Sequence, residues 1–476
     1  MANQDISKII HINSGFQKML EGEKIICLVD GQHYPLVTKN TLEVLRKIGA
    51  EIKALIFLGG TEKVEDAEEE LGEADIDIFM SCSKEQLPIQ NLRKAISKYD
   101  PKIVVDLSDE PVVDYGDRFE IASSVLQEGA TYMGADFFFS PPNELNVLEK
   151  PSLSIIGTGK RVGKTGVSVS IARTLKGKGH EPVIVCMGRG GPPEPDYIDP
   201  KKIAMNADTL LKVSEKGGHA ASDYWEDALL AQVSTVGCRR CGGGMAGNPF
   251  SSNVIKGALK TNNLKENLVI MEGSGSTFPP VKTEAKIVII GASQPLDNIL
   301  EYFGQYRINI SDLAIITMCE EPMASEEKIE DIETGINELN PNIDIARTIF
   351  RPQPLKDITG KKVFVATTAP EDILPKIMEH IETEKGAEIV GHSNKLSNRE
   401  ALRKDLNRGL KEAEMLLTEI KAASIDVAGK SAKEKGAEIV FMHNESILVG
   451  GTVETFEEAV LDVYDKAMER YGGQND

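Results

Sequence analysis

The chain carries Gly157-Thr158-Gly159-Lys160-Arg161-Val162-Gly163-Lys164-Thr165 directly after an apolar run, Leu153 to Ile156. Apolar residues at helical spacing follow, so the segment lies between a predicted strand and a predicted helix. Backbone N–H groups in such a glycine-rich turn converge on phosphate oxygens, and the N-terminus of the following helix adds partial positive charge. The sequence therefore predicts a phosphate cradle, with an α/β domain around it.

The predicted cradle departs in one respect from the usual phosphate loop. In the pattern G-x-x-x-x-G-K-[ST] the first glycine would stand at position 158, where this chain has Thr158, with Gly157 one residue earlier. Lys164 is expected to reach the terminal phosphates, and the Thr165 hydroxyl to ligate magnesium. A plain glycine turn is the alternative, but the flanking strand and helix favour nucleotide binding. The predicted nucleotide-binding residues are Gly157, Thr158, Gly159, Lys160, Arg161, Val162, Gly163, Lys164, Thr165 and Gly166.

A carboxylate follows a second predicted strand in the same region. Residues 267–271 form this apolar strand, which ends in Glu272-Gly273-Ser274-Gly275. A carboxylate at the tip of a strand beside a phosphate loop is placed to ligate magnesium or to orient its water, and a turn glutamate is the alternative. The predicted metal ligands are therefore Thr165 and Glu272. No Asn-Lys-x-Asp follows the later strand at 313–318, so guanine selection has no support and ATP is the expected nucleotide.

Two glycine-rich loops in this region carry arginines. One is Gly188-Arg189-Gly190-Gly191-Pro192-Pro193-Glu194-Pro195-Asp196, and the other is Val236-Gly237-Cys238-Arg239-Arg240-Cys241-Gly242-Gly243-Gly244-Met245-Ala246-Gly247. Glycines let a ligand approach the backbone, and arginine binds phosphate in a planar, bidentate way. Surface loops are the alternative, but in an acidic protein these loops favour a second anionic ligand. The predicted substrate-binding residues are Lys160, Arg189, Gly190, Arg239, Arg240 and Gly243.

The charge balance limits the partners. Of 476 residues, 54 are basic and 74 are acidic, which gives a formal net charge of −20. This charge disfavours non-specific nucleic-acid binding, so an anionic ligand needs a local basic pocket. No apolar run reaches the roughly 18 residues of a membrane span, and the N-terminus lacks the apolar core of a signal peptide. We expect a cytoplasmic protein without nucleic-acid or membrane partners.

The cysteines are too sparse and irregular for a disulfide framework, so reduced thiols are expected. The six are Cys27, Cys82, Cys186, Cys238, Cys241 and Cys319. Cys238 and Cys241 form a lone C-x-x-C, with His219 as the other nearby candidate ligand. A structural zinc site normally needs four ligands. Ordinary loop thiols are therefore favoured over a zinc or redox site.

The order of predicted elements indicates an α/β fold in three parts. Residues 1–148 alternate strands and helices and predict a Rossmann-like parallel-sheet domain. Residues 149–375 are expected to form the larger phosphate-loop domain, and residues 376–476 a C-terminal helical and α/β extension that packs on it. The extension contains an apolar stripe at helical spacing, which predicts a packing or oligomer face. The stripe residues are Leu402, Leu406, Leu410, Leu417 and Ile420.

Further candidate ligands follow other predicted strands. Ligands of open parallel sheets bind beyond the carboxyl ends of the strands. In residues 1–148 this rule selects Asp30, His33, Asp106, Ser108 and Asp109. Asp and Ser at such places also cap helices and form turns, which is a strong alternative. Near the C-terminus, His443 follows a predicted strand and is either an active-site residue or a structural histidine.

Two resemblances to known families give these motifs a function. The phosphate loop and the strand ending in Glu272-Gly273 resemble those of dethiobiotin synthetase, in the class that contains the ParA/MinD ATPases. The N-terminal domain, the Met187 to Pro195 loop and the Cys238 to Gly244 loop resemble the archaeal cyclic 2,3-diphosphoglycerate synthetases over nearly the full chain. This resemblance implies magnesium- and ATP-dependent closure of 2,3-diphosphoglycerate into a cyclic phosphoanhydride, with release of ADP and phosphate. It also favours a homodimer.

The implied reaction must overcome repulsion between phosphates. Two unit charges about 4 Å apart repel by about 4 kcal/mol at an effective dielectric constant near 20. A loose phosphoryl-transfer transition state needs positioning and charge stabilisation more than a strong base, so the lack of an obvious catalytic histidine is no objection. The predicted catalytic residues are Lys164, Glu272, Arg189, Arg239 and Arg240.

Two other functions fit a phosphate loop of this kind. A ParA- or MinD-like regulatory ATPase normally carries a second signature lysine at the position of Gly159, whereas this chain has Lys160 one residue later. Another ring-closing or carboxylate ligase of the dethiobiotin synthetase type fits the same loop, and only substrate testing separates it. Many Glu and Lys residues with few aromatics are compatible with a thermophile.

Overall fold

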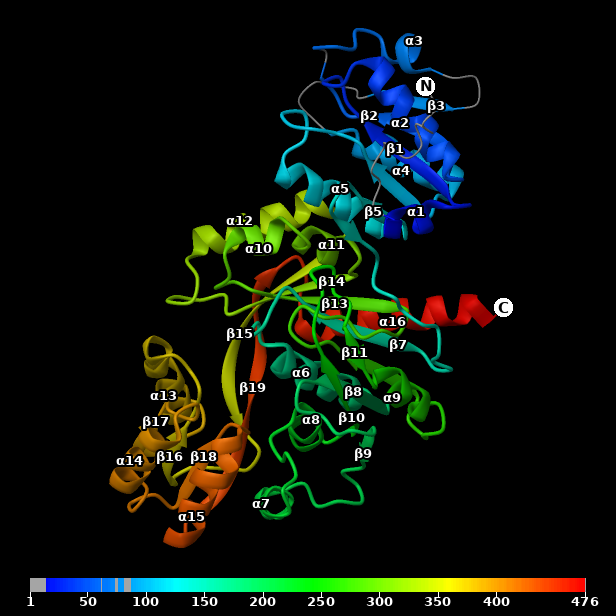
Figure 1. Ribbon diagram of the computed structural model, residues 1–476. Helices are drawn as coiled ribbons and strands as arrows, with labels where there is room; N and C mark the ends of the chain where they lie inside the picture. The colour runs from blue at the N-terminus through cyan, green and yellow to red at the C-terminus, as the bar shows by residue number, and fades with distance from the viewer. Residues whose placement is uncertain (1–13, 61, 73–75, 81–86, 476) are drawn as a thin grey trace. The chain divides into compact units, whose positions relative to one another are not determined.

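The computed structural model describes residues 14–60, 62–72, 76–80 and 87–475. The chain forms two compact units, which are coloured by residue number in Figure 1. The N-terminal unit contains Met1–Pro142 with Leu300–Ile310, and the larger unit contains Asn143–Ile299 with Ser311–Asp476. Each unit has a sheet and helices, which confirms the α/β fold class. The three-part division at residues 148 and 375 stays a prediction.

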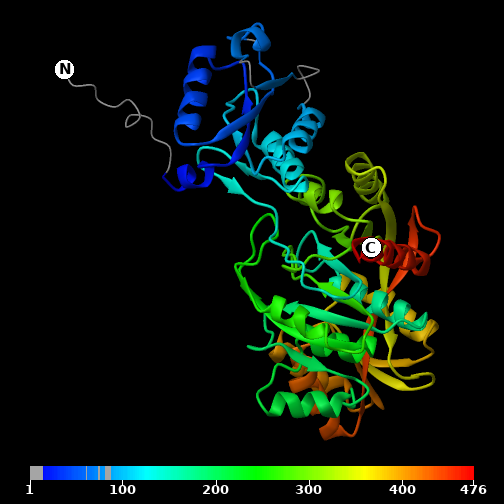
Figure 2. The ribbon, with the colours of Figure 1, turned by 90° about the vertical axis from the view of Figure 1, so that its right-hand side faces the viewer.

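The N-terminal unit is a small doubly wound domain. Its sheet has the order β3-β2-β1-β4-β5-β6, in which β6 alone is antiparallel to its neighbour. The strands are β1 Lys24–Val29, β2 Glu51–Phe57, β3 Asp77–Met80, β4 Ile103–Asp106, β5 Thr131–Met133 and β6 Phe138–Phe139. The helices are α1 Ser14–Leu20, α2 Pro35–Lys47, α3 Ala67–Leu71, α4 Ile89–Tyr99, α5 Tyr115–Gln127 and α11 Gly304–Asn309. Helices flank this sheet on both sides (Figure 2). The strand order reverses between β1 and β4, where ligands of such sheets bind.

The acidic residues at this switch point accept hydrogen bonds from their own loops and from neighbouring elements of the N-terminal unit. Asp30 accepts hydrogen bonds from the Gln32 N–H at 2.9 Å, from His33 Nδ1 at 2.9 Å and from the Asp109 N–H at 2.5 Å. Asp106 accepts from the Ser108 hydroxyl at 2.5 Å, from Arg118 Nε at 3.2 Å and from the Tyr132 hydroxyl at 2.6 Å. These bonds use the carboxylates as turn and loop supports. The geometry favours the structural alternative for all five candidates of this unit.

The larger unit is built on one long sheet with the order β11-β10-β8-β12-β7-β13-β14-β15-β19-β18-β16-β17, and β9 pairs with β10. Its strands are β7 Ser152–Gly157, β8 Pro182–Gly188, β9 Asp196–Ile198, β10 Ser234–Cys241, β11 Ser251–Ser252, β12 Leu268–Glu272, β13 Ala285–Gly291, β14 Leu313–Thr317, β15 Asp344–Pro354, β16 Lys362–Ala366, β17 Glu388–Ser393, β18 Met415–Thr418 and β19 Glu438–Gly451. The strands from β10 to β15 in this order are parallel, and so are β19, β18, β16 and β17. The antiparallel pair of β15 and β19 joins the two parallel groups (Figure 1).

Helices cover both faces of the first parallel group. The helices of the larger unit are α6 Lys164–Gly177, α7 Ala207–Glu215, α8 Asp223–Ala231, α9 Val254–Thr261, α10 Leu296–Leu300, α12 Glu326–Leu339, α13 Leu374–Thr383, α14 Arg399–Gly409, α15 Lys430–Lys435 and α16 Phe456–Asn475, of which α13, α14 and α15 pack on the C-terminal strands. Residues of α6, α8 and α16 share one buried cluster with the sheet, and residues of α9 share another. Strands β7, β8 and β12 are buried along their whole length, as expected between two layers of helices. None of the helices in the described ranges is both long and apolar enough to cross a membrane.

Two sequence predictions about local structure are wrong. The segment from Val236 was expected to be a loop, but β10 continues to Cys241 and includes both arginines. The stripe from Leu402 to Ile420 was expected to be one helical face. Instead α14 ends at Gly409, Leu417 lies on β18, and all five stripe residues are fully buried. The stripe is therefore core, and it gives no support to a dimer.

Candidate active site

The predicted phosphate cradle lies between β7 and α6. The turn passes through the left-handed region at Arg161, with φ 64°, and at Gly163, with φ 84°. A Cβ atom on Gly163 would lie 2.4 Å from the Phe350 ring, so both backbone and packing require glycine there. Lys164 Nζ donates a hydrogen bond to the Gly159 carbonyl at 2.9 Å. The lysine side chain is thus folded back over the loop that it is predicted to serve.

The unusual spacing of the loop has a structural reason. A Cβ atom on Gly157 would lie 3.0 Å from Lys164 Nζ, so the early glycine leaves room for the lysine. The Thr158 hydroxyl donates to Gln294 Oε1 at 2.5 Å, and its N–H donates to the Ile289 carbonyl at 3.1 Å. The threonine therefore fastens the loop to the end of β13.

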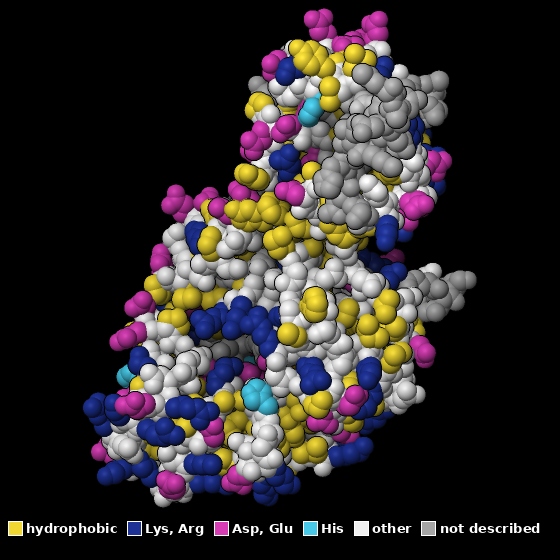
Figure 3. All heavy atoms as spheres, in the orientation of Figure 1, with side chains coloured by type: hydrophobic (Ala, Val, Ile, Leu, Met, Phe, Trp, Pro, Cys, Tyr) yellow, Lys and Arg dark blue, Asp and Glu magenta, His cyan; other side chains and the backbone are white. Residues whose placement is uncertain are grey.

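A cleft of about 950 Å³ opens at the cradle. On the face shown in Figure 3, Lys and Arg side chains gather along a hollow in the larger unit. The cleft is lined by residues from the cradle, from the ends of β8 and β12, from α8 and from the C-terminal strands. The predicted residues among them are Lys160, Arg161, Gly163, Lys164, Thr165, Gly166, Arg189, Gly190, Glu272 and His443.

Lys164 and Glu272 carry opposite charges in the buried part of this cleft. Burial lowers the pKa of Lys164 to about 8, although the negative charges of Glu272 and Asp223 oppose this shift. Burial, together with the charge of Asp223, raises the pKa of Glu272 to about 7. Each group is therefore desolvated and depends on its neighbours for its charge. A polyphosphate with a divalent cation would supply the missing partners.

The donor atoms fit a magnesium ion. Magnesium prefers oxygen ligands and usually keeps one or two protein ligands beside phosphate oxygens. Glu272 is 4% exposed, and its Oε2 atom has no hydrogen-bond partner in the described part of the chain. A buried carboxylate oxygen without a partner is costly, which indicates that a cation or a water completes it. The Thr165 hydroxyl, at the start of α6, lines the same cleft.

Arg189 and Arg240 converge at the turn after β12, the strand that ends in Glu272. A Cβ atom on Gly275 would lie 3.0 Å from Arg189 Nη2 and 3.5 Å from Arg240 Nη2, so both guanidinium groups reach the turn after β12. Arg240 donates to the Ser274 carbonyl at 2.7 Å and to the Gly242 carbonyl at 2.9 Å. Burial and the charge of Arg189 lower the pKa of Arg240. The two positive guanidinium groups repel each other, and an anion bound between them would relieve this repulsion. The pair is therefore a candidate anion site.

The structure separates the two arginines that the sequence grouped. Arg239 and Arg240 are consecutive on β10, and consecutive strand residues point to opposite faces. Arg240 is half-buried and contacts Ser274 in the wall of the cleft, whereas Arg239 is exposed. Gly243 adjoins Arg240, because a Cβ atom there would lie 3.3 Å from Arg240 Nη1.

Comparison with known proteins identifies the family of this chain. Its residues match three family models of cyclic 2,3-diphosphoglycerate synthetase: the N-terminal domain at residues 24–140, the P-loop domain at 152–349 and the C-terminal domain at 354–445. The chain belongs to the cyclic 2,3-diphosphoglycerate synthetase family. This finding confirms the resemblance that the motifs suggested.

Curated relatives carry the same name over nearly their full length. The cyclic 2,3-diphosphoglycerate synthetase of Methanothermus fervidus is 47% identical and covers 95% of this chain and 99% of its own. That of Methanothermobacter thermautotrophicus is 46% identical, with coverages of 94% and 97%. That of Rubrobacter xylanophilus is 42% identical, with coverages of 90% and 95%. The family thus spans the N-terminal unit as well as the cleft.

Several residues of the cleft were missed by the sequence analysis. Asp223 and Glu226 lie in the first turn of α8, and Lys421 follows β18 in the C-terminal group of strands. Lys421 Nζ lies 3.2 Å from both carboxylate oxygens of Glu226, so this ion pair crosses the cleft. The spacing of Asp223 and Glu226 at the start of an apolar helix was the sequence signal that could have identified these two carboxylates. Nothing in the local sequence connects Lys421 to them.

His443 lies on β19 and lines the cleft, as the hypothesis of an active-site histidine requires. It is 2% exposed, and neither ring nitrogen has a hydrogen-bond partner in the described ranges. Burial lowers its pKa to about 4, with smaller contributions from Arg173 and Lys385. The imidazole is therefore neutral near pH 7.

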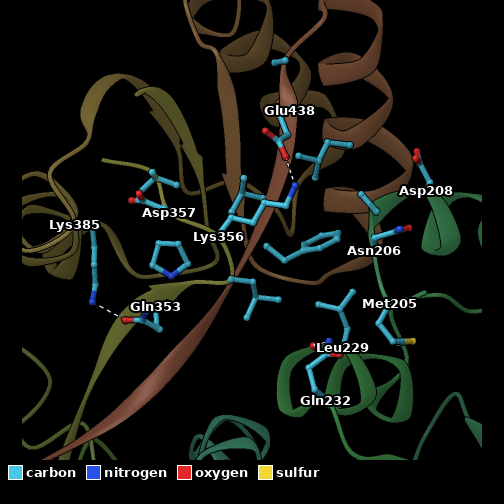
Figure 4. A pocket seen from close by; sticks show the side chains of 18 of the residues that line it. Met205, Asn206, Asp208, Leu229, Gln232, Gln353, Lys356, Asp357, Lys385 and Glu438 are labelled. Atoms are coloured by element: carbon cyan, nitrogen blue, oxygen red, sulfur yellow. Dashed lines mark hydrogen bonds and ion pairs between the residues drawn. The ribbon is translucent and has the colours of Figure 1, made fainter. Parts of the chain in front are cut away.

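A second cavity, of about 960 Å³, lies in the same unit and has no cradle residue in its wall. It is lined from α7, the end of α8, the segment after β15 and the start of β19 (Figure 4). In this cavity Lys356 bonds Glu438 and Lys433 bonds Asp208, whereas Arg173 bonds the Leu230 carbonyl and Lys385 bonds Gln353. The phosphate cradle opens into the cleft at Lys164 and not into this cavity, so the cleft is the candidate site for phosphate chemistry.

The C-x-x-C pair does not assemble a zinc site. Cys238 is buried and Cys241 is exposed, and residues three apart on one strand point to opposite faces. His219 lies beside Gly190, where a Cβ atom would come within 3.0 Å of its ring. In the described ranges the grouped metal-ligating side chains are Cys186, Asp227 and Glu272. Ordinary thiols remain the better interpretation, and Cys82 lies outside the described residues.

Proposed function

We propose that this protein uses ATP to close 2,3-diphosphoglycerate into cyclic 2,3-diphosphoglycerate, with release of ADP and phosphate. Family membership supports this activity over the whole chain. The carrying observation is that Arg189 and Gly275 line the same cleft as the phosphate cradle at Lys164, and that Arg240 reaches the wall of this cleft at Gly275. The first site suits the nucleotide, and the second suits the phosphates of a small anionic substrate.

The chemistry takes two phosphoryl steps. An oxygen of one substrate phosphate attacks the γ-phosphorus of ATP, the bond from that phosphorus to the bridging oxygen breaks, and ADP leaves. The substrate then carries a diphosphate. An oxygen of the neighbouring phosphate attacks the inner phosphorus of this diphosphate, and inorganic phosphate leaves with the original substrate oxygen. Both steps involve the same substrate phosphate beside the γ-phosphate position, so one phosphate cradle is enough for the two steps.

The residues contribute charge and position. Lys164 holds the terminal nucleotide phosphates, while Arg189 and Arg240 hold the two substrate phosphates close enough to react. Lys160 is exposed and lines the same cleft. Thr165 and Glu272 would hold magnesium, which supplies charge neutralisation on the nucleotide phosphates. Such preorganised charges act most strongly where water is excluded, as at Lys164 and Glu272.

Phosphorus NMR of the purified protein with magnesium, ATP and 2,3-diphosphoglycerate tests the proposal. We expect a new cyclic phosphoanhydride resonance to appear together with ADP and phosphate. Lys164→Ala should abolish it, whereas Lys178→Ala, at the exposed end of the same helix, should not. Hydrolysis of ATP without a cyclic product would keep the nucleotide site but reject the substrate. Another ring-closing or carboxylate ligase, or a regulatory ATPase, would then be favoured.

Two further expectations remain for this protein. A homodimer is proposed on the family resemblance alone, because the buried stripe no longer supports it. Light scattering of the full chain measures the oligomeric state directly. The cytoplasmic location stays a prediction from the sequence.

A further inference from the structure

The cleft at Lys164 extends to both sides of the phosphate cradle. The cradle follows β7, which lies in the middle of the strand order β8-β12-β7-β13-β14-β15. On one side Arg189 follows β8 and Gly275 follows β12, and both line the cleft. On the other side Met318 follows β14 and Phe350 lies on β15, and these residues line the same cleft. The cleft therefore has a polar arm with the arginines and a second arm beside β14 and β15.

The second arm is apolar. Its hydrophobic side chains come from β15, from the segment after β14, and from α13 with the turn before it. They include Met318, Met323, Phe350, Pro352, Ile373 and Ile377. Met318, Met323, Phe350 and Ile377 are half-buried, so they leave apolar surface in the wall of the cleft. Ligand pockets of small molecules are typically lined in this way.

The carboxylate that belongs to this apolar arm is balanced by its own ion pairs. Glu320 lines the cleft after β14, and Arg351 donates to its two oxygens at 2.6 and 2.9 Å. Lys376 Nζ donates to Glu320 Oε2 at 2.8 Å and to the Glu321 carbonyl at 2.6 Å. Both cations therefore direct donors to Glu320. The apolar arm suits an uncharged, flat group better than another phosphate.

The orientation of a nucleotide in the cradle follows from the position of Lys164. Charged groups that act electrostatically on Lys164 include Glu272, at the end of β12, and Arg189, after β8. The terminal phosphates that this lysine is predicted to contact thus face the polar arm, and the nucleoside leaves the cradle toward β14 and β15. Phe350 lies on that path, because a Cβ atom on Gly166 would lie 3.3 Å from its ring.

We propose that the nucleoside of ATP binds in the apolar arm, against Phe350 and the first turn of α13, so that the C-terminal domain completes the nucleotide site. The inference rests on the nucleotide of the proposed function. Helix α13 lies within the part of the chain that matches the C-terminal family model, residues 354–445, and it packs against β15. Ile373 and Ile377 are four residues apart and supply one apolar face there. A base stacks on an aromatic ring through its π-face, without needing a hydrogen-bonding side chain.

Isothermal titration calorimetry with two ligands separates the nucleoside from the phosphates. The ligands are β,γ-imido-ATP and tripolyphosphate, each with magnesium, because both have three linked phosphates and only the first has a nucleoside. Phe350→Ala should raise the dissociation constant of β,γ-imido-ATP by about 5- to 150-fold, the range of base–aromatic stacking. Ile377→Asn should raise it by about 5-fold or more, since an amide replaces apolar contact area. Tripolyphosphate binding should stay within about 2-fold of wild type in both variants, because the phosphates contact the cradle.

Two further variants calibrate the measurement. Lys164→Ala should weaken the binding of both ligands, since both depend on the cradle. Ile447→Asn should change neither dissociation constant, because Ile447 is 36% exposed on β19 and lies outside the cleft lining. It is the matched control for Ile377→Asn. If Phe350→Ala does not fold, Phe350→Leu takes its place, because leucine keeps apolar bulk and removes the aromatic face.

The outcomes separate this inference from the proposed function. Unchanged binding of β,γ-imido-ATP in a folded Ile377→Asn protein overturns the inference. An equal loss of both ligands in either variant overturns it too, because the substitution would then act on the cradle. If the binding results are as expected but no cyclic product forms, the substrate of the proposed function is rejected and the inference stands. A wild-type protein that binds neither ligand rejects both.

Discussion

The N-terminal unit and the larger unit both end parallel strands in polar loops, but they use their charged groups differently. In the N-terminal unit Asp30 and Asp106 accept hydrogen bonds from their own loops and from Tyr132 and Arg118. In the larger unit Glu272 keeps an oxygen without a partner in the described ranges, and two arginines stand side by side. At the carboxyl ends of the strands, Asp30 and Asp106 of the N-terminal unit have hydrogen-bond partners. At the same position in the larger unit, Glu272 has an oxygen without one in the described ranges.

This difference shows how a ligand site is recognised in a doubly wound fold. An unsatisfied buried polar group costs about 1–3 kcal/mol, so it persists where a ligand compensates for it. Carboxyl ends of strands are where ligands bind, but they are also where loops need hydrogen-bond acceptors. The cleft at Lys164 contains a buried carboxylate oxygen without a partner among the described residues, whereas both carboxylate oxygens of Asp30 accept hydrogen bonds.

The largest expected effect contrasts two strand-end carboxylates. Glu272→Gln should lower turnover by about 100-fold or more, because a neutral amide ligates magnesium poorly at a site built on preorganised charge. Its folding stability should be unchanged or raised, since a buried charge is removed. Asp106→Asn should leave turnover unchanged and lower stability by about 2 kcal/mol, because Arg118 loses its charged partner. ADP release and thermal denaturation measure the two effects.

The opposite result for either variant would contradict this contrast between the strand ends of the two units. If Asp106→Asn abolished turnover in a folded protein, the N-terminal edge would hold a ligand after all. If Glu272→Gln retained full activity at limiting magnesium, the unpartnered oxygen would have no chemical role.

The second effect contrasts two consecutive arginines. Arg240→Ala should raise the KM for 2,3-diphosphoglycerate by about 10- to 100-fold, as expected for a charge-assisted phosphate contact. Arg240→Lys should restore little, because a point charge cannot reproduce the fork that bonds Ser274 and Gly242. Arg239→Ala, on the other face of β10, should change KM by less than about 2-fold. Equal effects of the two Ala variants would reject the assignment of the anion site to one face.

The smallest effect concerns pH and the His443 imidazole, which has no hydrogen-bond partner among the described residues. The pKa of His443 is about 4 in the folded protein and near 6.5 in the unfolded chain. Between these values the unfolded chain binds more protons, so stability falls as the pH falls below about 6.5. The expected loss between pH 7 and pH 5.5 is about 1 kcal/mol. His443→Gln should flatten this part of the denaturant-unfolding profile, and an equal slope in the variant would assign it to other groups.

Much of the fold was readable because local patterns settled it. The buried strands β7, β8, β12 and β13 are continuous apolar runs, and the cradle residues identify the start of α6. Strand β10 was missed because Gly237 and the following glycines favour a loop. In the structure a Cβ atom on Gly237 would lie 2.5 Å from the Tyr224 ring, so the glycine serves packing within a strand. Tertiary contact, which no local pattern contains, decided this element.

The candidate site was only partly readable for the same reason. Lys164 and Glu272 follow recognisable strands, and the cleft brings them together. Leu402 and Leu417 share helical spacing by coincidence, since one lies on a helix and the other on a strand. Lys421 joins the site through an ion pair with Glu226, a residue far away in the sequence. Such partners become visible only when the elements are placed in space.

The central claim is that the substrate itself attacks ATP and that the same phosphate leaves on ring closure. Single-turnover reaction of 2,3-diphosphoglycerate labelled with ¹⁸O in its non-bridging phosphate oxygens tests this claim. The account predicts that the inorganic phosphate released carries one ¹⁸O atom from the substrate, seen as an isotope shift in its phosphorus NMR signal. Phosphate that carries an oxygen from solvent water, and none from the substrate, would contradict it.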